Sequence, residues 1–99
     1  MAHVTGGGLL DNLPRMLPAD LSAELDPGSW PVPPIFDHLT ALGDLSPDDR
    51  CRAFNMGVGF AVAMDPSDAP ALLAAVDGST VVGRVVPTPA GGERVIGRV

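Results

Sequence analysis

Apolar and polar residues alternate along the chain at two spacings, which predict a succession of short strands and helices. Residues 2–5 read as a strand and Gly6–Gly8 as a turn, and the apolar residues after the turn recur at helical spacing up to about residue 16. Pro14 is expected to distort that helix locally. The alternating stretch Leu21–Leu25 predicts a short edge strand.

Three further helices and a buried strand are predicted in the middle of the chain. Residues 34–42 form a helix with Pro34 at its first position and Gly43 just beyond its end; its apolar face is Ile35, Phe36, Leu39 and Leu42. Ser46 caps a helix that runs to about Phe54. The continuous apolar run 57–64 is typical of a central buried strand. Residues 68–76 form the third helix, whose expected buried face is Leu72, Leu73 and Val76.

The chain is expected to end in two strands, 81–86 and 93–99, joined by a loop of hairpin type. The predicted order is therefore β-α-β-α-α-β-α-β-β. Runs of both element types favour the α+β class, with helices layered on a mixed sheet.

The composition of the chain excludes some classes of binding partner but does not indicate a function. The chain has 99 residues and a net charge of −6, which argues against nucleic acid or an anionic membrane as the main partner. A single cysteine excludes an internal disulfide and favours the cytoplasm, and no Cys/His cluster offers a metal site. No apolar run is long enough to span a bilayer.

The segment "AHVTGGGLLDN" is the main candidate for chemistry. A glycine turn between a strand and a helix start leaves backbone N–H groups free to bind an anion, since no Cβ holds a phosphate away. Thr5 offers a hydroxyl, and His3 lies on the same face of the strand. An alternative stays open, in which the glycines only let the helix pack closely on the sheet.

Three ordered motifs carry a family resemblance. The segment "AHVTGGGLLDNLPRMLP" resembles a signature of the aminoimidazole ribonucleotide synthetases, also called phosphoribosylformylglycinamidine cyclo-ligases. The segments "SWPVPPIFDHL" and "RAFNMGVGFAVAM" are similar to two later motifs of that family. Across the three segments, the departures from the family's pattern are Asp11, His38, Ala53 and Phe60. The resemblance covers the whole chain, and implies the later part of the family's C-terminal domain, without its N-terminal ATP-binding domain.

The resemblance also implies an activity. The family closes the ring of formylglycinamidine ribonucleotide to aminoimidazole ribonucleotide in purine biosynthesis, using ATP and Mg²⁺, and works as a homodimer. We expect the N-terminal domain to bind most of the ATP, so the 99 residues alone should be inactive. Alternatives are a non-catalytic phosphate-binding or partner domain and another member of the superfamily, such as a selenophosphate synthetase, a thiamine-monophosphate kinase or a hydrogenase-maturation protein.

Site roles follow from the matched positions. The resemblance implies that Gly6–Gly8 cradle the 5′-phosphate of the substrate with Thr5 beside them, that Asn12 bonds to the glycine loop or to the ligand, and that His3 acts in proton transfer. Arg15 is a possible supporting residue that could instead pair with a nearby acid. The other possible supporting residues are Arg52, Asn55 and Gly57, for which a structural role is favoured, with Asn55 bonding its own backbone in a turn.

Overall fold

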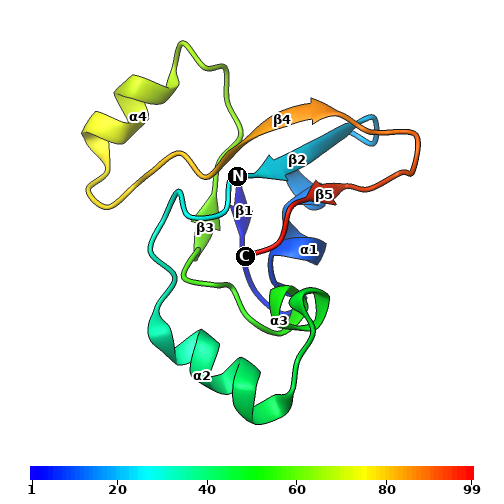
Figure 1. Ribbon diagram of the computed structural model, residues 1–99. Helices are drawn as coiled ribbons and strands as arrows, with labels where there is room; N and C mark the ends of the chain where they lie inside the picture. The colour runs from blue at the N-terminus through cyan, green and yellow to red at the C-terminus, as the bar shows by residue number, and fades with distance from the viewer.

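A computed structural model describes all 99 residues, and its elements follow the predicted order with one short helix added. The chain has the α+β character that the sequence indicates (Figure 1). The elements are β1 (Ala2–His3), α1 (Gly8–Asn12), the 3₁₀ helix η1 (Pro14–Met16), β2 (Leu21–Leu25), α2 (Pro34–Gly43), α3 (Pro47–Ala53), β3 (Phe60–Ala61), α4 (Ala69–Ala75), β4 (Gly83–Pro87) and β5 (Val95–Ile96).

The larger sheet has the strand order β4-β2-β5, so β2 is its central strand and the predicted edge position is wrong. Its alternating pattern is that of a half-exposed strand, yet the polar Ser22 is fully buried and donates to the carbonyl of Glu93. The predicted β4–β5 hairpin is also wrong. β4 pairs antiparallel with one edge of β2, and β5 pairs parallel with the other edge.

The smaller sheet consists of β1 and β3, paired antiparallel with His3 opposite Phe60. The run 57–64 is therefore not a central buried strand, because only two of its residues are in the ladder and β1 is its sole neighbour. Phe60 is 63% exposed, and Val62 and Met64 are exposed as well. An apolar run alone does not show how many strands will flank it.

The positions of the helices along the chain were predicted better than the faces that they bury. The expected distortion at Pro14 is a change from α1 to the 3₁₀ helix η1. α2 ends one residue later than expected, and Asp44, not Gly43, takes the left-handed cap conformation at φ 50°. Neither α2 nor α4 buries a residue, and the predicted buried face of α4 is wrong because Leu73 and Val76 are exposed.

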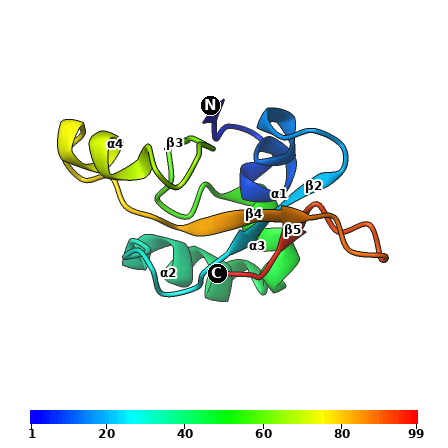
Figure 2. The ribbon, with the colours of Figure 1, turned by 90° about the horizontal axis from the view of Figure 1, so that it is seen from above.

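Figure 2 shows α4 at one end of the molecule and the β4–β5 loop at the other. None of the helices has the length and apolar character that a membrane crossing requires.

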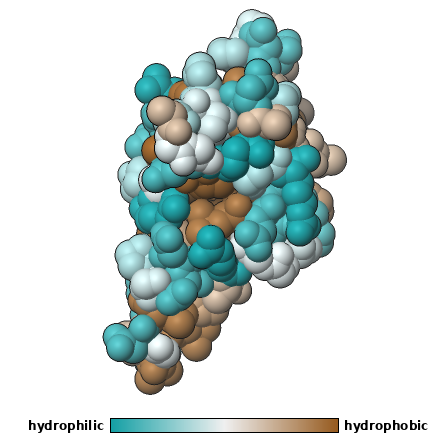
Figure 3. All heavy atoms as spheres, turned by 90° about the vertical axis from the view of Figure 1, so that its right-hand side faces the viewer, coloured by the Kyte–Doolittle hydropathy of each residue, from teal (hydrophilic) through white to brown (hydrophobic).

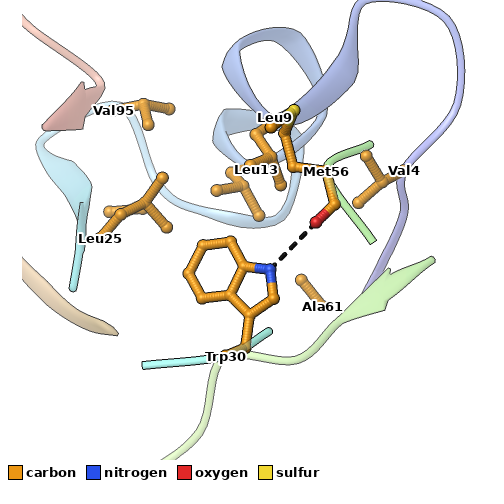
Figure 4. Packing of buried hydrophobic residues seen from close by; sticks show 9 residues of the cluster. Val4, Leu9, Leu13, Leu25, Trp30, Met56, Ala61 and Val95 are labelled. Carbon is orange, nitrogen blue, oxygen red and sulfur yellow. Dashed lines mark hydrogen bonds between the residues drawn. The ribbon is translucent and has the colours of Figure 1, made fainter. Parts of the chain in front are cut away.

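The core lies where α1 and the two sheets meet, around Trp30 (Figure 4). The indole Nε1 of Trp30 donates to the carbonyl of Met56 over 3.1 Å, and Met56 has no exposed surface. Only 14 of the 99 residues are buried, so this core is small and its stability depends on few side chains. Its members are Val4, Leu9, Leu13, Ala23, Leu25, Trp30, Met56, Ala61 and Val95.

Candidate functional site

The glycine run forms a tight turn between β1 and α1. The N–H of Gly8 donates to the carbonyl of Thr5 over 2.9 Å, and Gly7 has φ 94° and ψ −12°. These are the values of the third residue of a type II turn, a position that needs a positive φ and therefore glycine. The N–H groups of Gly6 and Gly7 have no acceptor within the chain.

The three glycines differ in what the fold demands of them. A Cβ on Gly8 would meet the carbonyl oxygens of Cys51 and Phe54, the latter at 2.6 Å, and Gly8 also has φ 60°. Close packing of α1 against α3 thus requires glycine at position 8, and the turn conformation requires glycine at position 7. Gly6 has no positive φ, and a Cβ there would meet nothing within 4 Å. The fold places no demand on Gly6, and it is exposed.

Asn12 holds the turn in shape from inside. It is 1% exposed, and its Nδ2 donates to the carbonyls of Gly8 at 2.8 Å, Thr5 at 3.2 Å and Gly6 at 3.3 Å. Nη1 of Arg15 donates to Asn12 Oδ1 over 3.1 Å. The alternative pairing of Arg15 with a nearby acid is absent, since Arg15 makes no ion pair. Asn12 therefore positions the turn, and Arg15 positions Asn12.

His3 and Thr5 share the exposed face of the first strand, as the alternation predicts, while the residues between and before them are buried. The ring of His3 stacks on that of Phe60, with centroids 4.5 Å apart and planes 12° apart. Oγ1 of Thr5 makes a long hydrogen bond of 3.5 Å to Asn12 Oδ1. The stacking fixes the plane of the imidazole beside the glycine turn.

The segment 54–59 packs directly against this turn. The N–H of Val4 donates to the carbonyl of Gly59 over 2.8 Å, in line with the β1–β3 ladder. Oδ1 of Asn55 accepts from the N–H of Gly57 over 2.8 Å, which is the structural role favoured for Asn55. Gly57 has φ 93°, and a Cβ there would lie 2.7 Å from Cδ of Pro33. The three motifs of the resemblance therefore meet around one core.

Arg52 does not belong to the glycine turn. It is exposed on α3, makes no hydrogen bond, and lines a separate small hollow with Arg94 and Arg98. Of the possible supporting residues, only Arg15 is connected to the turn by a hydrogen bond between side chains.

The electrostatics of the turn are mixed. A Cβ on Gly7 would lie 2.5 Å from Asp11 Oδ2, so the carboxylate of Asp11 lies next to the turn. Its negative charge repels any anion that binds there. The two carboxyls with lowered pKa lie elsewhere. Hydrogen bonding and attraction from Arg98 lower the pKa of Asp48, and hydrogen bonds from the backbone and side chain of Ser67 lower the pKa of Asp65. No group of three or more His, Cys, Asp or Glu side chains is placed to hold a metal ion.

Comparison with known proteins decides the family. A family model described as "AIR synthase related protein, C-terminal domain" matches residues 1–96. The chain belongs to this family. Its curated relatives include proteins named phosphoribosylformylglycinamidine cyclo-ligase, and the family places the chain among proteins related to a ligase of purine biosynthesis.

Three relatives show how far the similarity extends. The Bacillus subtilis (strain 168) cyclo-ligase is 59% identical over 64 residues, which cover 65% of this chain and 18% of that protein. The Nitrosococcus oceani cyclo-ligase is 44% identical over 99 residues, covering 96% of this chain and 28% of that protein. The Limosilactobacillus fermentum cyclo-ligase is 43% identical over 100 residues, covering 97% and 29%. The chain thus spans less than a third of the length of these curated relatives.

Two features of the structure were not predicted from the sequence. Met56 has φ 55°, a conformation that is costly for a residue with a Cβ. The indole hydrogen bond from Trp30 holds it there. Its place between Asn55 and Gly57, two residues typical of turns, was a usable signal. The second feature is the convergence of Arg94 and Arg98 on Arg52, which their distance in sequence hides.

Proposed function

We propose that this chain forms part of a cytoplasmic phosphoribosylformylglycinamidine cyclo-ligase, which closes the ring of formylglycinamidine ribonucleotide at the expense of ATP. Its glycine turn holds the 5′-phosphate of that substrate. The observation that carries the proposal is Gly6, whose lack of a side chain is explained neither by φ nor by packing. A bare, exposed backbone with free N–H groups at Gly6 and Gly7 is the surface that a phosphate needs to approach.

Asn12, Thr5 and His3 have different roles around that phosphate. Asn12 orders the carbonyls of the turn on the inner side, so that the N–H groups of Gly6 and Gly7 remain available on the outer side. Thr5 adds a hydroxyl on the exposed face. The imidazole of His3, held by Phe60, is the group that moves a proton at the reacting amidine.

The family resemblance implies ATP and Mg²⁺, and we assign both mainly to an N-terminal ATP-binding domain of the same homodimeric enzyme. In this chain, no group of three or more His, Cys, Asp or Glu side chains is placed to hold a metal ion. The exposed apolar side chains of Phe60, Val62 and Leu42 fit a chain that packs against further protein.

Binding of formylglycinamidine ribonucleotide to the 99-residue chain, followed through its amide NMR signals, tests the proposal. Gly6→Ala should weaken binding about tenfold, since a hydrogen bond to a charged group is worth about 1.5–3 kcal/mol. Asp11→Asn should tighten it about fivefold, because one close unit charge in water is worth about 1 kcal/mol. Gly91→Ala is the matched control, as a Cβ at Gly91 also meets nothing within 4 Å.

Two results would overturn the proposal. Equal affinities for the Gly6→Ala and Gly91→Ala variants would remove the phosphate from the glycine turn. Measurable cyclisation of the substrate by the purified 99-residue chain would contradict the assignment of ATP to a separate domain.

A further inference from the structure

Half of the chain's cations line one small hollow. The sequence has six cationic side chains against twelve acidic ones, and Arg52, Arg94 and Arg98 converge on a cavity of about 180 Å³. Leu10 and Val95 supply its apolar lining, and one acid, Glu93, also lines it. Figure 3 shows the side of the molecule on which β5 lies, where hydrophilic residues surround a recess with a hydrophobic floor. Such a concentration of positive charge is unexpected in an acidic chain.

Two of the guanidinium groups are held rigidly. Arg94 donates through Nε to the carbonyl of Leu21 and through Nη2 to that of Pro18 at 2.9 Å. Arg98 pairs through Nε with Asp48 over 2.6 Å, and its Nη1 donates to the carbonyl of Val95. Both side chains are thus fixed before any ligand arrives, which lowers the entropy lost on binding.

Each of these arginines keeps donors without a partner. Nη1 of Arg94 and Nη2 of Arg98 make no hydrogen bond within the chain, and Arg52 makes none at all. The acids Asp48 and Glu93 offset only two of the three positive charges. A rim with spare guanidinium donors and a net positive charge matches a doubly charged oxyanion.

We propose that this hollow is a second anion site, which binds a phosphate dianion either free or as the monoester of a small organic group. Its volume is below the roughly 300–1,000 Å³ typical of pockets that enclose larger organic ligands, which favours a small anion. None of its lining residues belongs to the glycine turn. The two proposed anion sites therefore use different residues.

Titration of the 99-residue chain with inorganic phosphate, observed through arginine Nε–H and backbone amide NMR signals, tests this site. Saturable shifts are expected at Arg94, Arg98 and Val95 by about 20 mM phosphate, which saturates a site of about 1 mM affinity. Arg52→Gln should weaken binding about tenfold, as one lost charged hydrogen bond predicts. Arg84→Gln is the control, because Arg84 is exposed on β4, at the edge of the sheet opposite β5, pairs with Glu24, and carries the same charge.

A second variant acts in the opposite direction. Asp48→Asn removes the acid that competes for Arg98 and should tighten phosphate binding. A parallel titration with ribose 5-phosphate identifies the ligand: tighter binding than inorganic phosphate favours a monoester, and equal binding favours the free ion.

Three outcomes would overturn the inference. They are the absence of saturable shifts around the hollow, equal weakening by the Arg52 and Arg84 variants, and shifts confined to Gly6 and Gly7. The last result would still support the glycine turn as a phosphate site, so failure of one proposal is distinguishable from failure of the other.

Discussion

Replacing Gly8 by alanine should destabilise the fold strongly, because this glycine joins α1 to α3. The added methyl would lie in the space of the Cys51 and Phe54 carbonyls, and these are backbone atoms that cannot rotate away. It would also force alanine into φ 60°. Left-handed backbone costs about 1–2 kcal/mol for a residue with a Cβ, and overpacking costs about 1–3 kcal/mol more. The total expected loss is about 2–5 kcal/mol.

That loss is large for this molecule. A chain of 99 residues has a free energy of unfolding of about 5–15 kcal/mol, and the small buried core places this one toward the lower end. At about 4–8 °C per kcal/mol, the melting temperature should fall by about 8–40 °C. Thermal unfolding followed by circular dichroism measures it directly.

Gly6→Ala is the internal control, two residues away in the same turn. Its Cβ meets nothing within 4 Å and its φ is not positive, so the variant should be neutral or more stable by up to about 1 kcal/mol. If Gly8→Ala proved as stable as Gly6→Ala, the packing of α1 on α3 described above would be wrong.

Three further predictions concern single contacts. Asn12→Ala should lower the urea midpoint of unfolding by an amount worth about 2–3 kcal/mol, because buried carbonyls of the glycine turn lose their donor. An unchanged midpoint would show that Asn12 does not hold the turn in shape. Trp30→Phe should cost about 2 kcal/mol by leaving the Met56 carbonyl unpaired, read from the same denaturation curves. Asp48→Asn should flatten the acid limb of the stability profile. The Arg98 contact lowers the folded-state pKa of Asp48 below 3.8, so its contribution is present above that value and is lost as pH falls through the lowered pKa. A parallel acid limb in wild type and variant would contradict that coupling.

Local signals in the sequence were reliable where the physics is local. Ser46 and Pro47 predicted the start of α3, and the structure shows the full capping box with Asp49. Pro34 marked the start of α2 correctly. Asn55 forms the self-bonded turn that its side chain favours. Each of these depends on contacts within a few residues, which the sequence contains.

Strand pairing was not predictable, because it depends on distant neighbours. Nothing in Leu21–Leu25 reveals that one edge of that strand will receive β4 and the other β5. The alternation that suggested an edge strand persists because Ser22, although polar, is buried with hydrogen-bond partners from residues 88 and 93. The exposed apolar side chains of α4 show the same limit, since amphipathic spacing identifies a face but not what covers it.

The structure shows what surrounds each residue of the candidate site, and the ligand roles of these residues stay predictions. The sequence left open whether the glycines serve packing or ligand approach, and the structure divides them, with Gly8 serving packing, Gly7 the turn, and Gly6 neither. Asn12 was expected to bond to the glycine loop or to the ligand, and its buried amide donates to the carbonyls of the loop. Why a position needs glycine can be decided only when the positions of the surrounding atoms are known.

Recognition of the substrate phosphate by the glycine turn can be tested by removing that phosphate. Formylglycinamidine ribonucleotide and the same compound lacking the 5′-phosphate are each titrated into the wild-type chain while the Gly6 and Gly7 amide signals are observed. Both amides should show saturable shifts with the ribonucleotide and none with the dephosphorylated compound. Equal shifts with the two compounds, or none with either, would contradict it.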